Sequence, residues 1–184
     1  MKNILRVFAV MIALLVSLVF ITVKTIAPDY GFDLAVDGVE SEVEVLFDDI
    51  GVPHIYAQSE TDAMHALGYV HAMERLWQMD LLRRAGAGEL SALLGPDMVE
   101  NDKYLRTLGM REAATRTVEQ MDAQANPHIL DAMTAYLDGI NTFIEKGELP
   151  LEYRVINAKP ESFDVHDMYC ATGFMAYSFA IHLK

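Results

Sequence analysis

The sequence is poor in cysteine and in tryptophan, and it has no low-complexity tract or internal repeat. Its 184 residues contain a single cysteine, Cys170, which excludes a disulfide within the chain. This cysteine lies in an apolar segment without the local signature of a cysteine nucleophile, so we expect a buried and unreactive thiol. The length and the absence of repeats predict one domain of ordinary size.

Basic residues are also scarce. Lysine and arginine number 14 against 27 aspartates and glutamates, which gives a formal net charge of −13. Residues 1–28 hold three of the basic residues and none of the acidic ones, so the remainder is more acidic still. Such a balance disfavours binding to nucleic acid or to anionic lipid, both of which require basic patches. It predicts an acidic, solvated surface, and leaves calcium binding by carboxylates open as an alternative.

A nearly uninterrupted apolar run occupies residues 7–23. As a helix its 17 residues would span about 26 Å, slightly less than the hydrocarbon core of about 30 Å, and adjoining residues close the gap. Lys2 and Arg6 precede the run, which predicts a cytoplasmic amino terminus. Because no A-x-A-like cleavage site follows, we favour an uncleaved membrane anchor over a signal peptide for residues 1–28. Either alternative places residues 29–184 on the extracytoplasmic or periplasmic side.

The segment after residue 28 begins with strand signals. Polar and apolar residues alternate over 33–39 and 42–47, and 53–57 continues as a strand after a turn at 49–51. These patterns predict two or three short strands in a small hairpin sheet.

Helical patterns fill the rest of the chain, which predicts an α+β fold that is mostly helical. Ser59 is the expected N-cap of the first helix, with Asp62 returning to it, and this helix should end near Arg84. We expect an irregular segment or a short strand over 149–160, and Asp164 as the cap of the last helix. The other predicted helical segments are 90–94, 102–120 and 126–146.

Glu74 is the most informative carboxylate. On a helical wheel it falls within an apolar face. The residues of that face are Ala63, Leu67, Val70, Trp77 and Leu81. A charge there requires a partner, and we predict a structural ion pair with Arg106, with Arg83 and His71 as alternative partners. An acid/base role for Glu74 is the less favoured interpretation.

The six histidines do not form a recognisable metal site. His71 and Glu74 are three residues apart, but a second Glu-x-x-His pair and a zinc-ligand spacing are both missing from the sequence. We therefore assign no metal site, and we interpret the 11 scattered methionines as core residues.

Four short motifs in fixed order carry a family resemblance. They are DDIGVPHI, GYVHAMERLWQMDLLRR, GAGELSALLG and LRTLG. Together they resemble the penicillin acylase (penicillin amidase) family of N-terminal-nucleophile hydrolases, in its amino-terminal, alpha-subunit-like part. The resemblance implies the helical alpha-subunit region of an αββα fold. It gives His54 and Glu74 structural roles. It places Met175 and Phe179, in GFMAYSF, at the pocket for the acyl group, while Ser178 stands where some members have arginine. Plain core packing is the alternative for Met175 and Phe179.

The resemblance also implies the mechanism. Members are precursors that cut themselves, and the freed amino-terminal serine of the beta chain attacks a linear N-acyl amide, such as a beta-lactam side chain or an acyl-homoserine lactone, with its own amine as the base. None of the serines here follows a glycine and opens a strand: Ser17, Ser41, Ser59, Ser91, Ser162 and Ser178. We therefore expect no catalytic residue in this chain and a beta-subunit-like partner from the same precursor.

The end of the sequence supports this expectation. The last predicted helix reaches Lys184 without a stop signal, which predicts a truncated chain. A carboxylate that binds calcium in some relatives would lie just beyond Lys184, so calcium is expected only in a full-length protein. The alternative from another class is a non-catalytic helical binding module or remnant.

Overall fold

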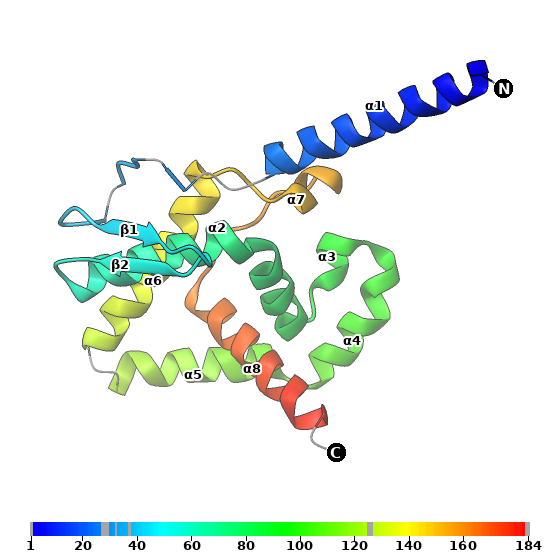
Figure 1. Cartoon of the computed structure of the whole chain (residues 1–184). Helices are drawn as coiled ribbons and strands as arrows, with labels where there is room; N and C mark the ends of the chain where they lie inside the picture. The colour runs from blue at the N-terminus through cyan, green and yellow to red at the C-terminus, as the bar shows by residue number, and fades with distance from the viewer. Residues whose placement is uncertain (1, 27–29, 32, 37, 125–126, 183–184) are drawn as a thin grey trace. The chain divides into compact units, whose positions relative to one another are not determined.

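Figure 1 shows the computed structural model, which describes the chain except for residues 1, 27–29, 32, 37, 125–126 and 183–184. The chain divides into two compact units, Met1–Leu34 and Ala35–Lys184. The first unit contains α1 (Lys2–Ile26), which includes the apolar run predicted to be helical. Across the described residues, no helix combines the length and the apolarity needed to cross a membrane, in contrast to the predicted membrane helix.

The second unit opens with the predicted hairpin. β1 (Glu44–Phe47) pairs antiparallel with β2 (Pro53–Tyr56), and Val45 lies opposite Ile55. Exposure alternates along both strands, so one face of the hairpin is half-buried. The described part of 33–39 forms no strand, and the sheet has two strands.

The hairpin turn is built around Asp48. Its Oδ1 accepts hydrogen bonds from the amides of Val52 at 2.8 Å and Ile50 at 3.0 Å. The bond from Val52 is the largest cause of the lowered pKa of this carboxyl group. Gly51 takes a φ of +81°, which a residue with a Cβ adopts only with strain. The predicted turn at 49–51 is confirmed.

The longest helix of the second unit is α2 (Glu60–Ala87). Ser59 caps it as predicted, because its Oγ accepts a hydrogen bond from the Asp62 amide at 3.1 Å. The pKa of the Asp62 carboxyl group is lowered first by the Glu40 amide, against the opposing effect of burial, and then by the Ser59 side chain. The Asp62 carboxylate accepts hydrogen bonds from the amides of Glu40 and Ser41, and so attaches the chain before the hairpin to α2.

A kink divides α2. Arg75 has φ −141° and ψ 17°, outside the helical region, and helical geometry resumes after it. The helix extends three residues past the predicted end at Arg84, and Gly88 terminates it in the left-handed conformation with φ +67°.

The single helix predicted for 102–120 is two helices in the structure. The elements that follow α2 are α3 (Leu90–Leu94), the 3-10 turn η1 (Pro96–Met98), α4 (Val99–Thr107) and α5 (Met110–Gln124). α4 and α5 are separated because Gly109 has φ +68°, which takes the chain out of the right-handed helix.

The remaining helices are α6 (Pro127–Lys146), α7 (Leu151–Val155) and α8 (Val165–His182). The short helix α7 lies where an irregular segment or a strand was expected. Asp164 caps α8 as predicted: its Oδ1 accepts from the Asp167 amide at 3.0 Å, and the Asp167 carboxylate accepts from the Asp164 amide at 3.1 Å. The expected cap Asn126 lies outside the described residues.

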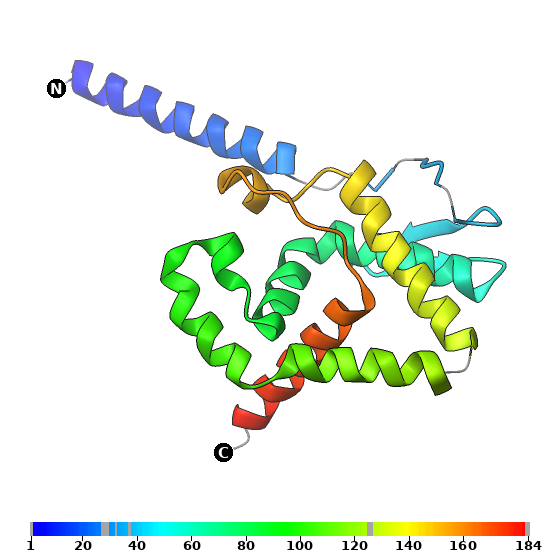
Figure 2. The ribbon, with the colours of Figure 1, turned by 180° about the vertical axis from the view of Figure 1, so that it is seen from behind.

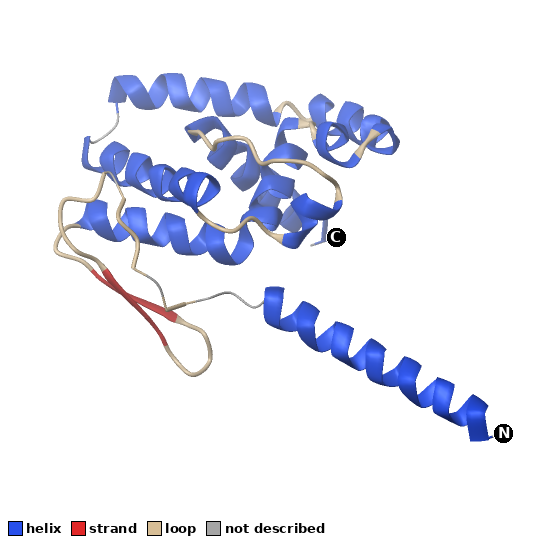
Figure 3. Ribbon diagram, turned by 90° about the horizontal axis from the view of Figure 1, so that it is seen from above, coloured by secondary structure: helices blue, strands red, loops and turns tan. Residues whose placement is uncertain are grey.

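The helices of the second unit pack around α2. α6 and α8 both contact it, and α5 contacts α8, which crosses it at an angle (Figure 2). The main core joins α2, α6, α7 and the segment immediately before α8. It consists of Ala72, Leu76, Leu137, Ile140, Phe143, Tyr153 and Phe163. Figure 3 shows that the described elements are helical apart from the hairpin, in agreement with the predicted mostly helical fold.

α2 and α8 approach each other closely at one glycine. A Cβ added to Gly86 would lie 2.1 Å from the carbonyl oxygen of Cys170, so the contact requires a residue without a side chain. Cys170 itself is fully buried, and burial raises the pKa of its thiol, as expected for an unreactive cysteine.

Candidate functional site

A fully buried carboxylate, Asp80, lies in the interior of the helical unit. Its Oδ1 accepts hydrogen bonds from Nε of Arg83 at 2.7 Å and from Nε of Arg84 at 2.9 Å. Its Oδ2 accepts one from the Tyr153 hydroxyl at 2.9 Å. We call these four residues the Asp80 cluster. The charges are paired and both carboxylate oxygens are bonded, which are the conditions for a stable buried ion pair.

Arg83 connects the Asp80 cluster to the start of α8. Its Nη1 donates to Oδ2 of Asp167 at 2.7 Å and to the carbonyl of Ser162 at 3.0 Å. Its guanidinium carbon lies 3.9 Å from the centre of the Phe163 ring, a cation–π contact. Burial opposes the charge, but the Asp80 and Asp167 carboxylates outweigh it and raise the pKa of Arg83. The cluster therefore fixes where α8 begins relative to α2.

Tyr153 connects the same cluster to α7. Its ring meets that of Trp77 edge-on, with 5.1 Å between the ring centres. Burial, followed by the charge of Asp80, raises the pKa of Tyr153, so its hydroxyl stays protonated and donates to Asp80.

A polar pocket of about 170 Å³ lies beside the Asp80 cluster. It is lined by Arg83, Arg84, Glu89, Arg111, Glu161, Ser162, Asp164 and Asp167. The guanidinium groups on its wall are paired with carboxylates, including Arg84 with Glu161 at 3.3 Å and Arg111 with Glu89 at 3.6 Å. Because this lining is charged, the pocket suits water rather than an apolar acyl chain.

The predicted structural pairing of Glu74 with Arg106 stays a prediction. Glu74 is half-buried, and Arg106 is exposed and donates from Nε to the carbonyl of Gly88 at 2.8 Å. The alternative partner Arg83 is bonded to Asp80. α2 is kinked immediately after Glu74, and of the predicted apolar face around it Val70 is buried.

His54 lies on β2 at the hairpin turn. Its side chain is 52% exposed, and Nε2 is 3.6 Å from Oδ2 of Asp48, the carboxylate that organises the turn. The structural role expected for His54 stays a prediction.

The two predicted acyl-pocket residues lie on α8 and are exposed. The exposed fractions of Met175 and Phe179 are 44% and 67%. They are four residues apart, on one helix face. Between them, Tyr177 forms a hydroxyl–hydroxyl hydrogen bond with Tyr104 of α4, and Ser178 Oγ donates to the Phe174 carbonyl at 2.9 Å. The structure thus presents these apolar side chains on a surface rather than in a closed pocket.

We expect Tyr104→Phe to loosen the exposed part of α8 without unfolding the protein. The substitution removes the Tyr104–Tyr177 hydrogen bond, which is exposed and therefore contributes little to global stability. Amide hydrogen exchange should become faster around Tyr177, with an unchanged melting temperature. Tyr56→Phe is the matched control, because Tyr56 on β2 is exposed to a similar degree, 57% against 55% for Tyr104. Equal exchange in α8 for both variants would contradict a bracing role for this bond.

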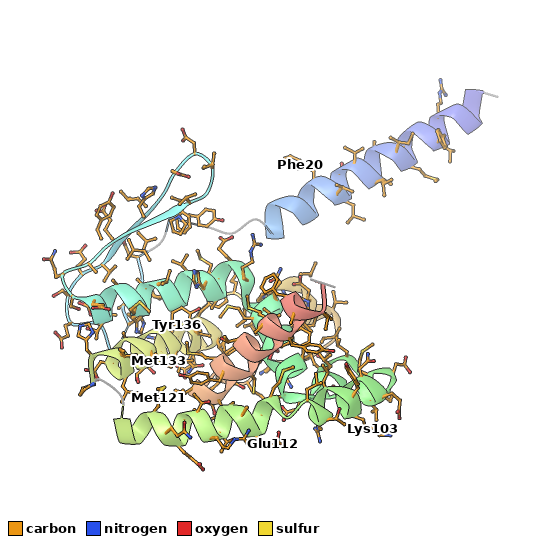
Figure 4. All side chains as sticks on the ribbon, turned by 90° about the horizontal axis from the view of Figure 1, so that it is seen from below. Phe20, Lys103, Glu112, Met121, Met133 and Tyr136 are labelled. Carbon is orange, nitrogen blue, oxygen red and sulfur yellow. The ribbon has the colours of Figure 1, made fainter. Side chains whose placement is uncertain are left out.

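Within the part of the chain that the structure describes, no group of three or more His, Cys, Asp or Glu side chains is placed to hold a metal ion. His71, which lies three residues before Glu74, contacts Tyr136: its Nδ1 lies 3.0 Å from the hydroxyl of Tyr136, which Figure 4 labels on α6.

The Asp80 cluster was not predicted, although the sequence contains a local signal for part of it. In LWQMDLLRR, Arg83 and Arg84 follow Asp80 at three and four residues, the spacing at which helical side chains meet. The contacts from Tyr153 and Asp167 depend on tertiary packing and have no local signal.

The fold and the site together define the structural class of this protein. It is a helical scaffold with a small hairpin, an internal ion-pair cluster and an exposed apolar face on α8. The sequence model of one family, described as penicillin amidase, matches residues 42–184. The chain therefore belongs to the penicillin amidase family of N-terminal-nucleophile hydrolases, as the four motifs predicted.

The relatives agree with this assignment. The chain is 39% identical over 138 residues to penicillin acylase 2 proenzyme of Pseudomonas sp. SE83, covering 74% of this chain and 17% of the relative. It is 31% identical over 141 residues to penicillin G acylase of Escherichia coli, covering 72% and 16%. It is 29% identical over 151 residues to acyl-homoserine lactone acylase QuiP of Pseudomonas aeruginosa, covering 81% and 17%. The chain thus spans about a sixth of the length of these relatives.

A solved structure has the same fold. Thermostable penicillin G acylase from Alcaligenes faecalis superposes with a TM-score of 0.65 at 32% identity, covering 76% of this chain and 74% of the compared chain. The similarity therefore extends over most of the helical unit rather than over the motifs alone.

Proposed function

We propose that this chain is the alpha-subunit-like part of an amide hydrolase that removes the acyl group from a small N-acyl amide. The observation that carries the proposal is the family match over residues 42–184. Relatives with a substrate in their names are acylases for penicillin or for acyl-homoserine lactones. A beta-lactam amide and an acyl-homoserine lactone are thus the two substrate classes we propose. An extracytoplasmic location is part of the same proposal.

In this proposal the chain contributes residues that bind the acyl group, and it contributes no catalytic residue. Met175 and Phe179 form the part of the acyl site that α8 contributes, and their exposure supports a surface that a second segment covers. That segment, which is beta-subunit-like and comes from the same precursor, brings the amino-terminal serine nucleophile and the groups that stabilise the oxyanion. The Asp80 cluster holds α8 in place and does not touch substrate.

The first test is an assay of the purified chain. We expect no release of amine from phenylacetyl or aliphatic-acyl amides, because no serine of this chain fits the nucleophile pattern. The chain should then replace the matching region of the 39% identical Pseudomonas proenzyme, and hydrolysis should appear in the chimera.

The chimera also tests the acyl site. Phe179→Ala should raise KM more than it lowers kcat, since acyl contacts bind ground state and transition state alike. Ile50→Ala, which removes an exposed apolar side chain from the hairpin turn, is the control. Turnover by the chain alone would refute the proposed division of roles, and a folded but inactive chimera would favour the alternative of a non-catalytic binding module.

A further inference from the structure

We propose that His65 is an acid-sensitive latch: protonation of its buried imidazole releases residues 38–41 from Asp62 and opens the base of the hairpin. This inference is independent of the proposed hydrolase function, because it concerns only how the chain before the hairpin is attached to α2.

The first observation is the burial of an unsatisfied imidazole. His65 is 3% exposed, and among the described residues neither Nδ1 nor Nε2 has a hydrogen-bond partner. A neutral imidazole tolerates such a site far better than an imidazolium, which has two N–H donors to satisfy and a charge to solvate. Burial accordingly lowers the pKa of His65, although the charges of Asp138 and Asp62 act in the opposite direction.

The second observation is what encloses the ring. At His65 the backbones of α2 and α6 are in close contact, because a Cβ added to Gly139 would lie 1.9 Å from the His65 carbonyl oxygen, so α6 has no room to move toward α2. Beside the ring itself lies Gly38, where an added Cβ would be 3.9 Å from both Cε1 and Nδ1 of the imidazole. Gly38 belongs to a largely exposed segment without secondary structure, residues 38–41. A ring that gains a charge therefore reaches water most easily on the Gly38 side.

The third observation is how residues 38–41 are held. The Asp62 carboxylate, 1% exposed, accepts hydrogen bonds from the Glu40 amide at 2.8 Å and the Ser41 amide at 3.2 Å. Asp62 also lies one helical turn before His65, so a protonated imidazole would compete with these two amides for the same carboxylate.

The charged groups around the ring fix the direction of the effect. Asp62 faces it from α2 and Asp138 from α6, while the ionisable side chain of residues 38–41 is that of the exposed Glu40. The Glu40 amide is the largest cause of the lowered pKa of Asp62, so Asp62 stays ionised at mildly acidic pH. Since the folded pKa of His65 is below its unfolded value, the closed state has its full stability above about pH 6.5 and loses it as the pH falls through the folded pKa.

The test is amide hydrogen exchange of the 184-residue chain, followed by NMR between about pH 5 and pH 7.5, the range in which histidine titrates. Protection factors of the Glu40 and Ser41 amides should fall severalfold on acidification, because protonation of His65 removes part of the free energy that keeps residues 38–41 closed. Amides within α6 should keep their protection. The His65→Gln and His65→Leu variants should show no such pH dependence, whereas His128→Gln, which changes an exposed histidine on α6, should behave as the parent does.

The imidazole signal of His65 is measured in the same samples. The unsubstituted chain therefore tests whether protonation of His65 and loss of protection at Glu40 and Ser41 occur together, even if a variant does not fold. Constant protection of Glu40 and Ser41 while His65 titrates would overturn the proposal. So would a measured His65 pKa at or above its ordinary value, or pH dependence that persists in both His65 variants.

Discussion

Asp80→Ala should destabilise the protein by about 3 to 5 kcal/mol, the usual cost of removing one partner from a buried ion pair. For a chain of this size the melting temperature should fall by roughly 6 to 20 °C. The variant leaves the Arg83 and Arg84 side chains, 5% and 7% exposed, without their shared carboxylate, and the Tyr153 hydroxyl without its acceptor. Thermal unfolding followed by circular dichroism measures the effect.

The matched control is Glu100→Ala. The Glu100–Lys103 pair has the same 2.7 Å separation as Arg83–Asp80, but its side chains are 82% and 67% exposed. An exposed pair of this kind contributes at most about 1 kcal/mol. The comparison therefore separates the effect of burial on stability from the effect of the distance between the charged atoms. Similar losses for Glu100→Ala and Asp80→Ala would show that the Asp80 cluster is not a principal source of stability.

A double-mutant cycle measures how strongly Asp80 and Arg84 are coupled in their contribution to the free energy of unfolding. If the shared Oδ1 couples Asp80 to Arg84, the combined variant Asp80→Ala with Arg84→Ala should be less destabilised than the sum of the single variants. Strict additivity would mean that the two residues act separately.

Gly86→Ala should cost about 2 to 4 kcal/mol, which is large for the addition of one methyl group. The new Cβ would lie 2.1 Å from the Cys170 carbonyl oxygen, so α2 and α8 must separate. Because α8 carries Met175 and Phe179, we expect the displacement to reach the proposed acyl site as well. Thermal unfolding gives the global effect, and hydrogen exchange along α8 gives the local one.

Gly173→Ala is the control for this variant. It adds a methyl group to α8 itself, where the Cβ would meet Met110 side-chain atoms at an ordinary 3.8 Å. Alanine is favoured over glycine in a helix by about 1 kcal/mol, so Gly173→Ala should be neutral or stabilising. Equal destabilisation by the two substitutions would contradict the close approach at Gly86.

Elements with local signals could be predicted from the sequence. The hairpin turn, the Ser59 cap and the Asp164 cap each depend on residues within a few positions of one another, and each is confirmed. The division of 102–120 into two helices was not predicted, because a single left-handed glycine, Gly109, interrupts an otherwise continuous helical pattern.

The buried face of α2 could be predicted only in part from hydrophobicity. On the side that the wheel selected, Val70 is buried, whereas Ala63, Leu67 and Trp77 are half-buried in the structure. Several residues of the buried side are polar or lack a side chain, and they are enclosed because of what they contact on other helices. They include His65, Gly68, Asp80 and Arg83. Their partners, such as Tyr153 of α7 and Asp167 of α8, are more than 70 residues away in the sequence. A charge buried by tertiary pairing therefore looks like a surface charge in the sequence.

The edge-on contact between Trp77 and Tyr153 gives the protein a built-in optical probe. Trp77 is the only tryptophan of the chain, so its intrinsic fluorescence comes from one place. Since the neighbouring tyrosine is also bonded to Asp80, emission intensity and wavelength report directly on whether this part of the interior is assembled. Stopped-flow refolding can thus be followed at the ion-pair cluster without attaching a dye.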